Sequence, residues 1–243
     1  MKKTVTNKSG MPFLDHLEEL RWRLIKSIIG IVIGSMIIFL FIDQIFEIML
    51  RPVKILENPP KLQVLKVHGM FMLKWFISLA GGFILALPVL TYQLWKFIAP
   101  GLLKNERRYA FPVIFFSFIA FLTGVLFAYF VIIPFSMEFF TSVGYVDVEN
   151  NFSINYYFSY LIWIILAAGL VFELPVLVVI LSSIGLVTPP FMRHYQRHAI
   201  VVILILSAFI TPPDPISLLM MSIPLIILYE ISIWLSKLFV KKV

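Results

Sequence analysis

An acidic residue near the N-terminus is placed where it could bind a cation. Glu19 lies in the segment HLEELRWRL (residues 16–24), two residues before Arg21 and four before Arg23. Apolar residues recur in this segment at three- and four-residue spacing, which predicts an amphipathic helix at the membrane interface. On such a helix Glu19 and Arg23 are neighbours and could simply pair with each other. The residues therefore fit either a helix-surface ion pair or a site for a cationic ligand.

The second charged cluster is a short polar stretch between two long apolar runs. Residues 95–112, WKFIAPGLLKNERRYAFP, contain one acid, Glu106, followed directly by Arg107 and Arg108. Glu106 could neutralise Arg107, and both arginines could anchor the chain at a membrane surface. The same groups could also bind a charged partner, because carboxylates and guanidinium groups form charge-assisted hydrogen bonds.

A third acid, Glu173, lies deep inside an apolar run, far from either end. A carboxylate in hydrocarbon is costly, so such a residue is a candidate functional group. It could be protonated, paired within the protein, or placed to meet a polar group on a partner helix. The alternative is a structural hydrogen bond to a neighbouring helix.

The chain has no sequence motif for catalysis. HExxH, GxSxG and phosphate-binding loops are absent, and so is cysteine, which excludes disulfides and thiolate sites. His194 and His198 are four residues apart, a spacing that permits a metal pair on a helix, but no carboxylate lies near them in the sequence. We therefore predict no enzyme activity, no metal site and no cofactor.

The composition is typical of a helical membrane protein. Of the 243 residues, 60% are hydrophobic and only 14% are charged, whereas a soluble domain carries about 25% charged residues. The net charge of +7 is explained by lysine and arginine in cytoplasmic loops rather than by nucleic-acid binding. The first apolar run is too long for the core of a cleavable signal, so we expect it to insert uncleaved.

Six apolar runs predict a single transmembrane domain over residues 1–243. The fifth run has only about a dozen apolar residues, roughly 20 Å of helix against a hydrocarbon core of about 30 Å. Pro224 interrupts the sixth run and Glu230 follows soon after. We therefore predict short fifth and sixth spans beside a thinned bilayer, with a re-entrant hairpin as the alternative. The approximate spans are residues 24–42, 71–94, 111–135, 156–186, 198–211 and 216–236.

The positions of lysine and arginine orient these spans. Basic residues occur in the N-terminal segment, after the second and fourth spans and at the C-terminus, whereas the second and third outer loops carry none. The first outer segment departs from this pattern, with Arg51, Lys54, Lys61 and Lys66. Because basic residues are enriched in cytoplasmic loops, we predict that both termini are cytoplasmic.

Several stretches, spread over nearly the whole chain, resemble one family of membrane proteins. In the sequence and order of these stretches, the chain is similar to the TatC family, the multispanning subunit of the twin-arginine protein translocase. The resemblance implies an all-α integral membrane fold with six transmembrane helices, cytoplasmic termini and short fifth and sixth spans. The matching stretches are HLEELRWRL (16–24), ALPVLTYQLWKFIAPGLLKNERR (86–108), FAYFVIIP (127–134), GLVFELPV (169–176), TPPDP (211–215) and IPLIILYEIS (223–232).

The resemblance also implies roles for the charged residues. The family's substrates carry two consecutive arginines in an export signal, and by their place in HLEELR and KNERR, Glu19 and Glu106 would bind that pair. A guanidinium forms a two-pronged hydrogen bond with a carboxylate that lysine cannot copy. Arg21, Arg107 and Arg108 would orient the two acids, meet acidic parts of partners, or anchor the chain.

Three further residues would belong to a partner-docking or translocation surface. Glu173 would form a polar spot inside a concave face. Asp214, in TPPDP, is expected at an outer turn, where Asp before Pro is also ordinary turn chemistry, and Tyr129 fits either packing or an interface. The chain departs from the family's pattern at residues 66–71, KVHGMF, where a proline and an acid are common, and at Leu218, where glutamine is common.

The resemblance predicts a receptor and scaffold of the cell inner (plasma) membrane, with no enzyme activity and no nucleic-acid partner. It would bind twin-arginine signal peptides of folded proteins and recruit TatA-type and TatB-type single-span subunits. We expect a homo-oligomer within a larger complex, driven by the proton-motive force. One alternative is a small secondary transporter or channel with Glu173 as its ion-coupling carboxylate. Another is an assembly protein without a signal-binding role.

Overall fold

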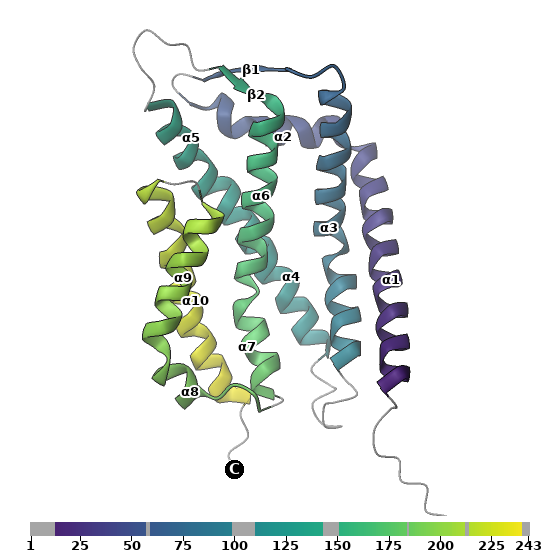
Figure 1. The fold of residues 1–243 in the computed structure, drawn as a ribbon, viewed down its shortest axis with the longest axis vertical. Coiled ribbons are helices and arrows are strands. Elements are labelled where there is room, and N and C mark those ends of the chain that lie inside the picture. Colours follow the sequence, from purple (N-terminus) through teal and green to yellow (C-terminus); the bar gives the residue numbers. More distant parts are fainter. Residues whose placement is uncertain are drawn as a thin grey trace, which may run out of the picture.

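Long helices lying side by side make up most of this computed structural model (Figure 1). The description covers residues 13–56, 59–98, 110–142, 151–183, 185–211 and 214–239. In chain order the elements are α1 (Phe13–Leu40), α2 (Ile42–Lys54), β1 (Lys61–Gln63), α3 (Gly69–Ile98), α4 (Ala110–Phe127), the π-helical turn η3 (Ala128–Ile132), α5 (Ile133–Ser142), β2 (Asn151–Ser153), α6 (Ile154–Phe172), α7 (Leu174–Ser183), α8 (Pro189–His194), α9 (Gln196–Ile210) and α10 (Pro215–Phe239).

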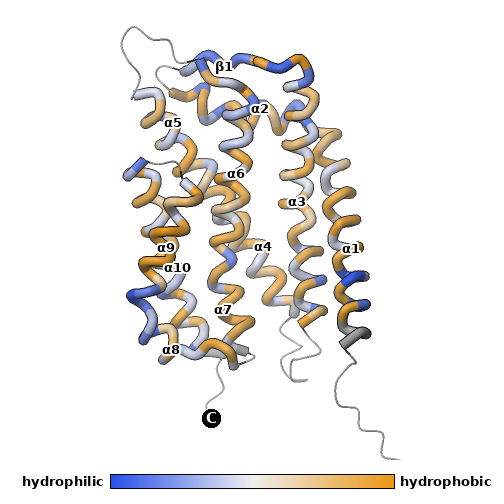
Figure 2. The backbone as a smooth tube through the Cα atoms, viewed as in Figure 1, coloured by the Kyte–Doolittle hydropathy of each residue, from blue (hydrophilic) through white to orange (hydrophobic). Residues whose placement is uncertain are grey.

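Within the described ranges, five helical segments are long and apolar enough to cross a bilayer, and apolar residues dominate along them (Figure 2). They confirm the predicted class, an all-α membrane protein. α9 is also apolar, but its 15 residues extend over only about 22 Å. The five segments are Leu17–Leu40, Gly69–Ile98, Phe111–Ser142, Ile154–Ser182 and Pro215–Lys237.

The last helix corrects one expectation. α10 is a continuous helix of 25 residues with Pro224 inside it, about 37 Å long. The prediction of a short sixth span is therefore wrong. A proline removes one backbone hydrogen bond, but transmembrane helices tolerate it because neighbouring groups satisfy the freed carbonyl.

Two glycines bring α1 and α3 into close contact. A Cβ atom built on Gly82 would lie 2.4 Å from the backbone nitrogen of Ser35, and one on Gly34 would lie 2.6 Å from the carbonyl oxygen of Gly82. Small residues at a helix interface let the two backbones approach, which is how many membrane helices pack. The start of α1 is thereby held at the end of the molecule where α3 finishes (Figure 1).

α6 occupies the centre of the bundle and α1 its edge. In the apolar segment Ile154–Ser182, which contains α6, half of the most apolar stretch is buried, against 11% for the segment Leu17–Leu40 of α1. Phe158, Leu161 and Ile164 of α6 are fully buried. At one end, α2 lies across the bundle and the parallel strands β1 and β2 pair Leu62 with Phe152 (Figure 1). At the other end, α1 begins, α3 ends, α4 begins and α10 ends (Figure 1).

Candidate functional site

Near the start of α1, Glu19 and Arg23 form the helix-surface ion pair, one of the two alternatives that the sequence left open. Arg23 Nε donates to Glu19 Oε1 at 3.0 Å, and Arg23 Nη2 donates to the same oxygen. The Glu19 side chain is only 22% exposed. Its other oxygen, Oε2, is buried and has no hydrogen-bond partner among the described residues. The ion pair thus uses only Oε1 of Glu19 and leaves Oε2 as a free acceptor among the described residues. Arg21 is exposed on the same helix.

The polar stretch after α3 starts and ends close to this level of the molecule. α3 ends at Ile98 and α4 begins at Ala110, at the end of the bundle where α1 begins (Figure 1). Glu106, Arg107 and Arg108 lie outside the described residues, so their geometry relative to Glu19 stays a prediction.

Glu173 joins a chain of polar side chains from three helices. Ser117 of α4 donates to Glu173 Oε1 at 2.6 Å, and the hydroxyl oxygens of Ser117 and Thr91 of α3 are 3.2 Å apart. Glu173 lies between α6 and α7, where Pro175 cannot donate a backbone hydrogen bond to Val171. The structural hydrogen bond that the sequence left open is therefore present, inside the apolar part of the bundle.

Tyr129 anchors α2 to the rest of the molecule. Its hydroxyl, on η3, donates to the carbonyl oxygen of Ile48 at 2.6 Å. That carbonyl would normally accept from the residue four positions later, which is Pro52 and has no N–H. A second tyrosine, Tyr157 of α6, donates to the next carbonyl, that of Met49, at 2.9 Å. Tyr129 thus has a definite structural partner, which the sequence did not reveal.

Replacing Tyr129 with phenylalanine is expected to loosen α2. The variant leaves the Ile48 carbonyl unpaired, which costs about 1–2 kcal/mol in a membrane protein. Amide hydrogen exchange in α2 should accelerate, while exchange in α1 should not change. Unaltered exchange in α2 would contradict this role. Phe130→Leu, at the exposed neighbouring position, serves as the control.

Asp214 lies directly before α10 and is buried, with only 2% of its surface exposed. Its Oδ1 accepts from the backbone nitrogen of Ser217 at 2.6 Å and so caps the start of α10. Asp before Pro is well suited to this position, because Pro215 is the first helical residue and needs no hydrogen-bond acceptor.

The chain matches known proteins over nearly its whole length. The family model described as "Sec-independent protein translocase protein (TatC)" matches residues 15–224. The Sec-independent protein translocase protein TatC of Aquifex aeolicus is 38% identical over 237 residues, 96% of this chain and 97% of the relative. That of Carboxydothermus hydrogenoformans is 39% identical over 228 residues, 93% of each chain. The chain belongs to the TatC family.

A solved structure agrees with this assignment. A crystal structure of the twin-arginine translocase receptor TatC superposes with a TM-score of 0.79 at 38% identity, over 92% of this chain and 99% of that one. Members of the TatC family are components of a protein translocase and not enzymes. With its apolar helices, the chain is a multi-pass protein of the cell inner membrane.

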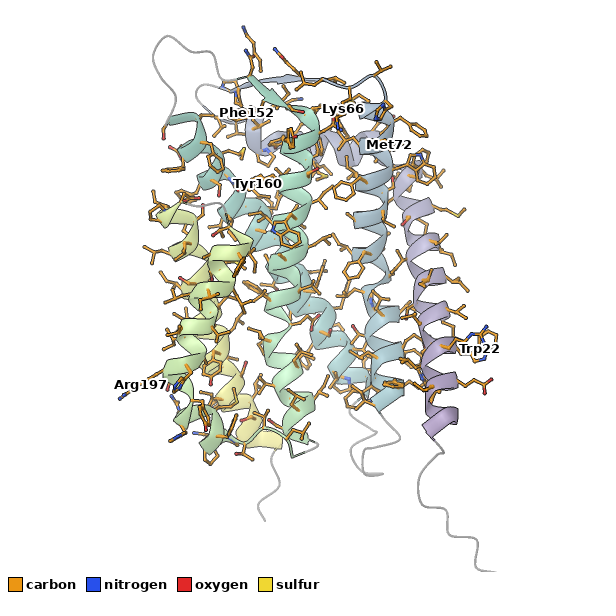
Figure 3. The ribbon with its side chains drawn as sticks, in the orientation of Figure 1. Trp22, Lys66, Met72, Phe152, Tyr160 and Arg197 are labelled. Carbon is orange, nitrogen blue, oxygen red and sulfur yellow. The ribbon has the colours of Figure 1, made fainter. Side chains whose placement is uncertain are left out.

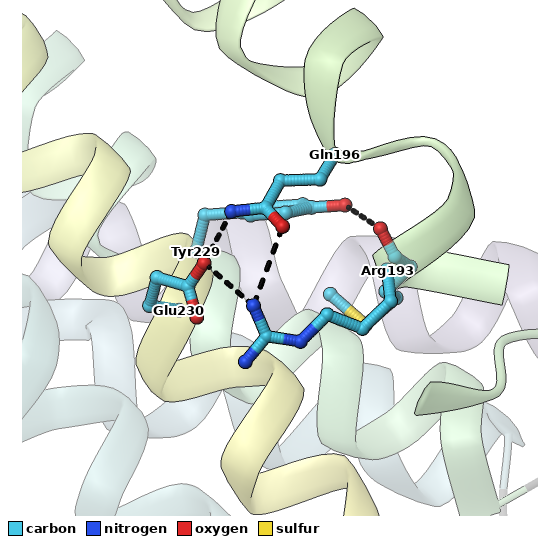
Figure 4. Close-up of polar contacts among 5 residues, drawn as sticks. Arg193, Gln196, Tyr229 and Glu230 are labelled. Atoms are coloured by element: carbon cyan, nitrogen blue, oxygen red, sulfur yellow. Dashed lines mark hydrogen bonds and ion pairs between the residues drawn. The ribbon is translucent and has the colours of Figure 1, made fainter. Parts of the chain in front are cut away.

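The chain also contains a polar cluster that its sequence did not reveal (Figure 4). Arg193 of α8 donates to Glu230 Oε1 of α10 at 3.0 Å, and Gln196 donates to the same oxygen. Tyr229 donates to the carbonyl of Met192 at 2.9 Å. The cluster connects the start of the short helix α9 to α10. In the sequence, only Glu230, an acid close to the end of an apolar run, indicated such a cluster. Its partners lie 34 and 37 residues away along the chain.

The described part of the chain contains no group of three His, Asp or Glu residues that could hold a metal ion. The rings of His194 and His198 contact that of Tyr195 in edge-on and tilted arrangements, with centroids 4.9 and 5.7 Å from that of the tyrosine. The two histidines lie on different helices, since His194 ends α8 and His198 belongs to α9.

Proposed function

We propose that this member of the TatC family is the signal-recognition and scaffold subunit of a twin-arginine translocase. The observation that carries the proposal is the unpartnered, buried Oε2 of Glu19. Arg23 already holds the carboxylate in a fixed orientation through its other oxygen. An incoming guanidinium would therefore find an oriented acceptor, and pairing would remove the cost of an unsatisfied oxygen.

Glu106 would supply the second carboxylate. The stretch that contains it joins the end of α3 to the start of α4, at the end of the bundle where α1 begins (Figure 1). Two acids would match two adjacent arginines, and Arg21, Arg107 and Arg108 would orient the acids or contact acidic parts of a partner. Lysine would bind more weakly because its ammonium group cannot form the two-pronged hydrogen bond.

The topology we propose has six crossings with both termini in the cytoplasm, in the spans predicted from the sequence. α1 begins and α10 ends at the same end of the bundle, which requires an even number of crossings (Figure 1). Five long segments and α9 supply six. Because α9 is about 8 Å shorter than the hydrocarbon core, the bilayer beside it would be thinned.

The polar chain around Glu173 would serve partner recruitment. We propose that it offers a hydrogen-bonding group to a single-span subunit of the TatA or TatB type, within a homo-oligomeric complex driven by the proton-motive force. Polar groups on membrane helices find partners because hydrocarbon offers none. Asp214 and Tyr129 would support this surface indirectly, by capping α10 and anchoring α2.

Replacing Glu173 with alanine is expected to weaken binding of such a single-span helix about 3- to 20-fold, the value of one interhelical hydrogen bond. Glu173→Gln should retain most of the binding, because its amide oxygen can still accept from Ser117. The measurement is fluorescence binding of a labelled partner helix in nanodiscs. Proton or solute flux through the purified chain alone would instead favour the transporter alternative.

The central test compares a twin-arginine signal peptide with its twin-lysine version, both titrated against the purified protein with and without Glu106→Ala. A preference for arginine that is lost in the variant is the expected result. Equal binding of both peptides, independent of Glu106, would leave the family assignment intact and remove the recognition role. Such a result would favour the alternative of an assembly protein without a signal-binding role.

A further inference from the structure

An apolar groove lies between α2 and the middle of the bundle. It has a volume of about 310 Å³ and is lined by residues of α2, α3, α4, η3 and α6. Along α3 it extends from Ile77 to Ile84, a distance of about 10 Å. Ile77 and Ile165 are buried, whereas Leu126 and Phe130, which also line the groove, are 53% and 67% exposed. The groove is therefore open on the side of Leu126 and Phe130.

The lining of the groove suits a hydrocarbon chain rather than water. Its residues are apolar apart from Tyr129, whose hydroxyl already donates to the carbonyl oxygen of Ile48. A buried water needs two to four polar partners. Three of the segments that line the groove are long and apolar enough to cross a bilayer. Because lipid chains surround such segments, an acyl chain is the group that can enter the opening.

Two basic side chains lie beside the rim of the groove. Ile48 of α2 lines the groove and is 46% exposed. Arg51 follows Ile48 by three residues, so the two side chains are neighbours on the helix surface, and Lys54 lies three residues further on. Arg51 and Lys54 are exposed, and neither side chain has a hydrogen bond or an ion pair among the described residues.

The charge of α2 is positive toward its end. Asp43 is paired with Lys74 of α3 at 2.8 Å, which leaves Glu47 against Arg51 and Lys54 among the charged residues of α2. The helix dipole favours basic residues in the last turn, but it does not require that they lie beside an open apolar groove. The contact between an acyl chain and the groove would not by itself select one lipid, because the bilayer is equally apolar. Selection needs a charged head group.

We propose that the groove binds an acyl chain of an anionic phospholipid whose phosphate contacts Arg51 and Lys54. Basic side chains beside a pocket between membrane helices recognise such head groups, and a guanidinium forms charge-assisted hydrogen bonds with phosphate. On the topology proposed above, the lipid comes from the outer leaflet, but binding depends neither on that topology nor on signal recognition. The site gives a role to basic residues in an outer segment, where few are expected.

The head group is tested by native mass spectrometry of the purified full-length protein. The protein is titrated with phosphatidylglycerol and with phosphatidylcholine that carries the same acyl chains. Phosphatidylglycerol should bind more tightly, and Arg51→Gln should weaken its binding about fivefold without changing that of phosphatidylcholine. Lys66→Gln is the matched control, because Lys66 is exposed at the same end of the molecule and does not line the groove (Figure 3).

The position of the chain is tested by photolabelling. A phosphatidylglycerol with a diazirine in its acyl chain should label peptides that contain groove residues such as Ile84 and Leu166. Ala80→Phe should fill the groove and lower this labelling several-fold. Leu79→Phe, at an exposed neighbouring position that does not line the groove, should leave it unchanged. If Ala80→Phe does not fold, Leu126→Trp at the exposed rim takes its place.

Four results would overturn the proposal. The first is equal affinity for the two lipids. The second is an equal loss in Arg51→Gln and Lys66→Gln, which would show only general attraction between charges. The third is labelling that persists in the variant with a filled groove, because the lipid then binds elsewhere. The fourth is displacement of the lipid by an equimolar single-span partner helix, which would assign the groove to that helix.

Discussion

Adding one methyl group at Gly82 is expected to separate α1 from α3 and to destabilise the protein strongly. The new Cβ would lie 2.2 Å from Ser35 Oγ and 2.4 Å from the Ser35 backbone nitrogen. A side-chain atom can rotate away, but a backbone atom moves only with its helix. We expect Gly82→Ala to lower the free energy of unfolding by about 3 kcal/mol and the midpoint temperature of unfolding by about 6–12 °C. It should also weaken peptide binding, because the start of α1 moves relative to α3.

The same interface provides a matched control. A Cβ on Gly30 of α1 would meet Val89 of α3 at 3.4 Å, a distance that a side chain can accommodate. Gly30→Ala should therefore change the midpoint by little, or even raise it, since alanine favours the helix over glycine. The measurement is thermal unfolding of both variants in the same detergent. Equal midpoints for Gly82→Ala and Gly30→Ala would show that the contact between α1 and α3 is not close enough to matter.

Replacing Glu19 with glutamine is expected to reduce binding of a twin-arginine peptide about 30- to 150-fold, because the loss of one partner from a buried charge pair costs about 2–3 kcal/mol. Glutamine keeps the size of the side chain and one acceptor oxygen, so the fold should survive. The preference for arginine over lysine should fall with the affinity. Titration of labelled peptide against the purified protein, at fixed salt, measures both.

Glu18 is the control for this experiment. It is the preceding residue, carries the same charge, and is exposed on α1. Glu18→Gln changes the net charge in the same way and should leave peptide binding within a factor of about two, because exposed charges contribute little. If both variants weaken binding equally, the effect is general electrostatic attraction and Glu19 has no special role.

Local sequence patterns predicted the features that depend on neighbours along one helix. The spacing of Glu19 and Arg23 gave their ion pair as one of two alternatives, since residues four apart share one face of any helix. The apolar runs predicted the all-α membrane class in the same way. The one local pattern that misled was Pro224, because a proline breaks a helix in water but is tolerated in a packed membrane helix.

Residues with distant partners could not be assigned in this way. Ser117 and Glu173 are 56 residues apart, and Tyr129 and Ile48 are 81 apart. The sequence predicted an outer turn at Asp214 but did not indicate that this side chain is buried. In each case the side chain alone allows several partners, and the choice depends on which helices lie together.

The sequence by itself determined that this protein is a helical membrane protein with charged ends, and it supplied the stretches that resemble the TatC family. The tertiary structure alone decided that Glu19 keeps one unpartnered oxygen, that Ser117 holds Glu173, and that Tyr129 takes the place of the N–H missing at Pro52. The physical reason is the separation along the chain of the residues that each interaction joins. Hydrophobic periodicity acts within one helix, whereas unpaired polar groups in hydrocarbon find their partners only after the helices have packed.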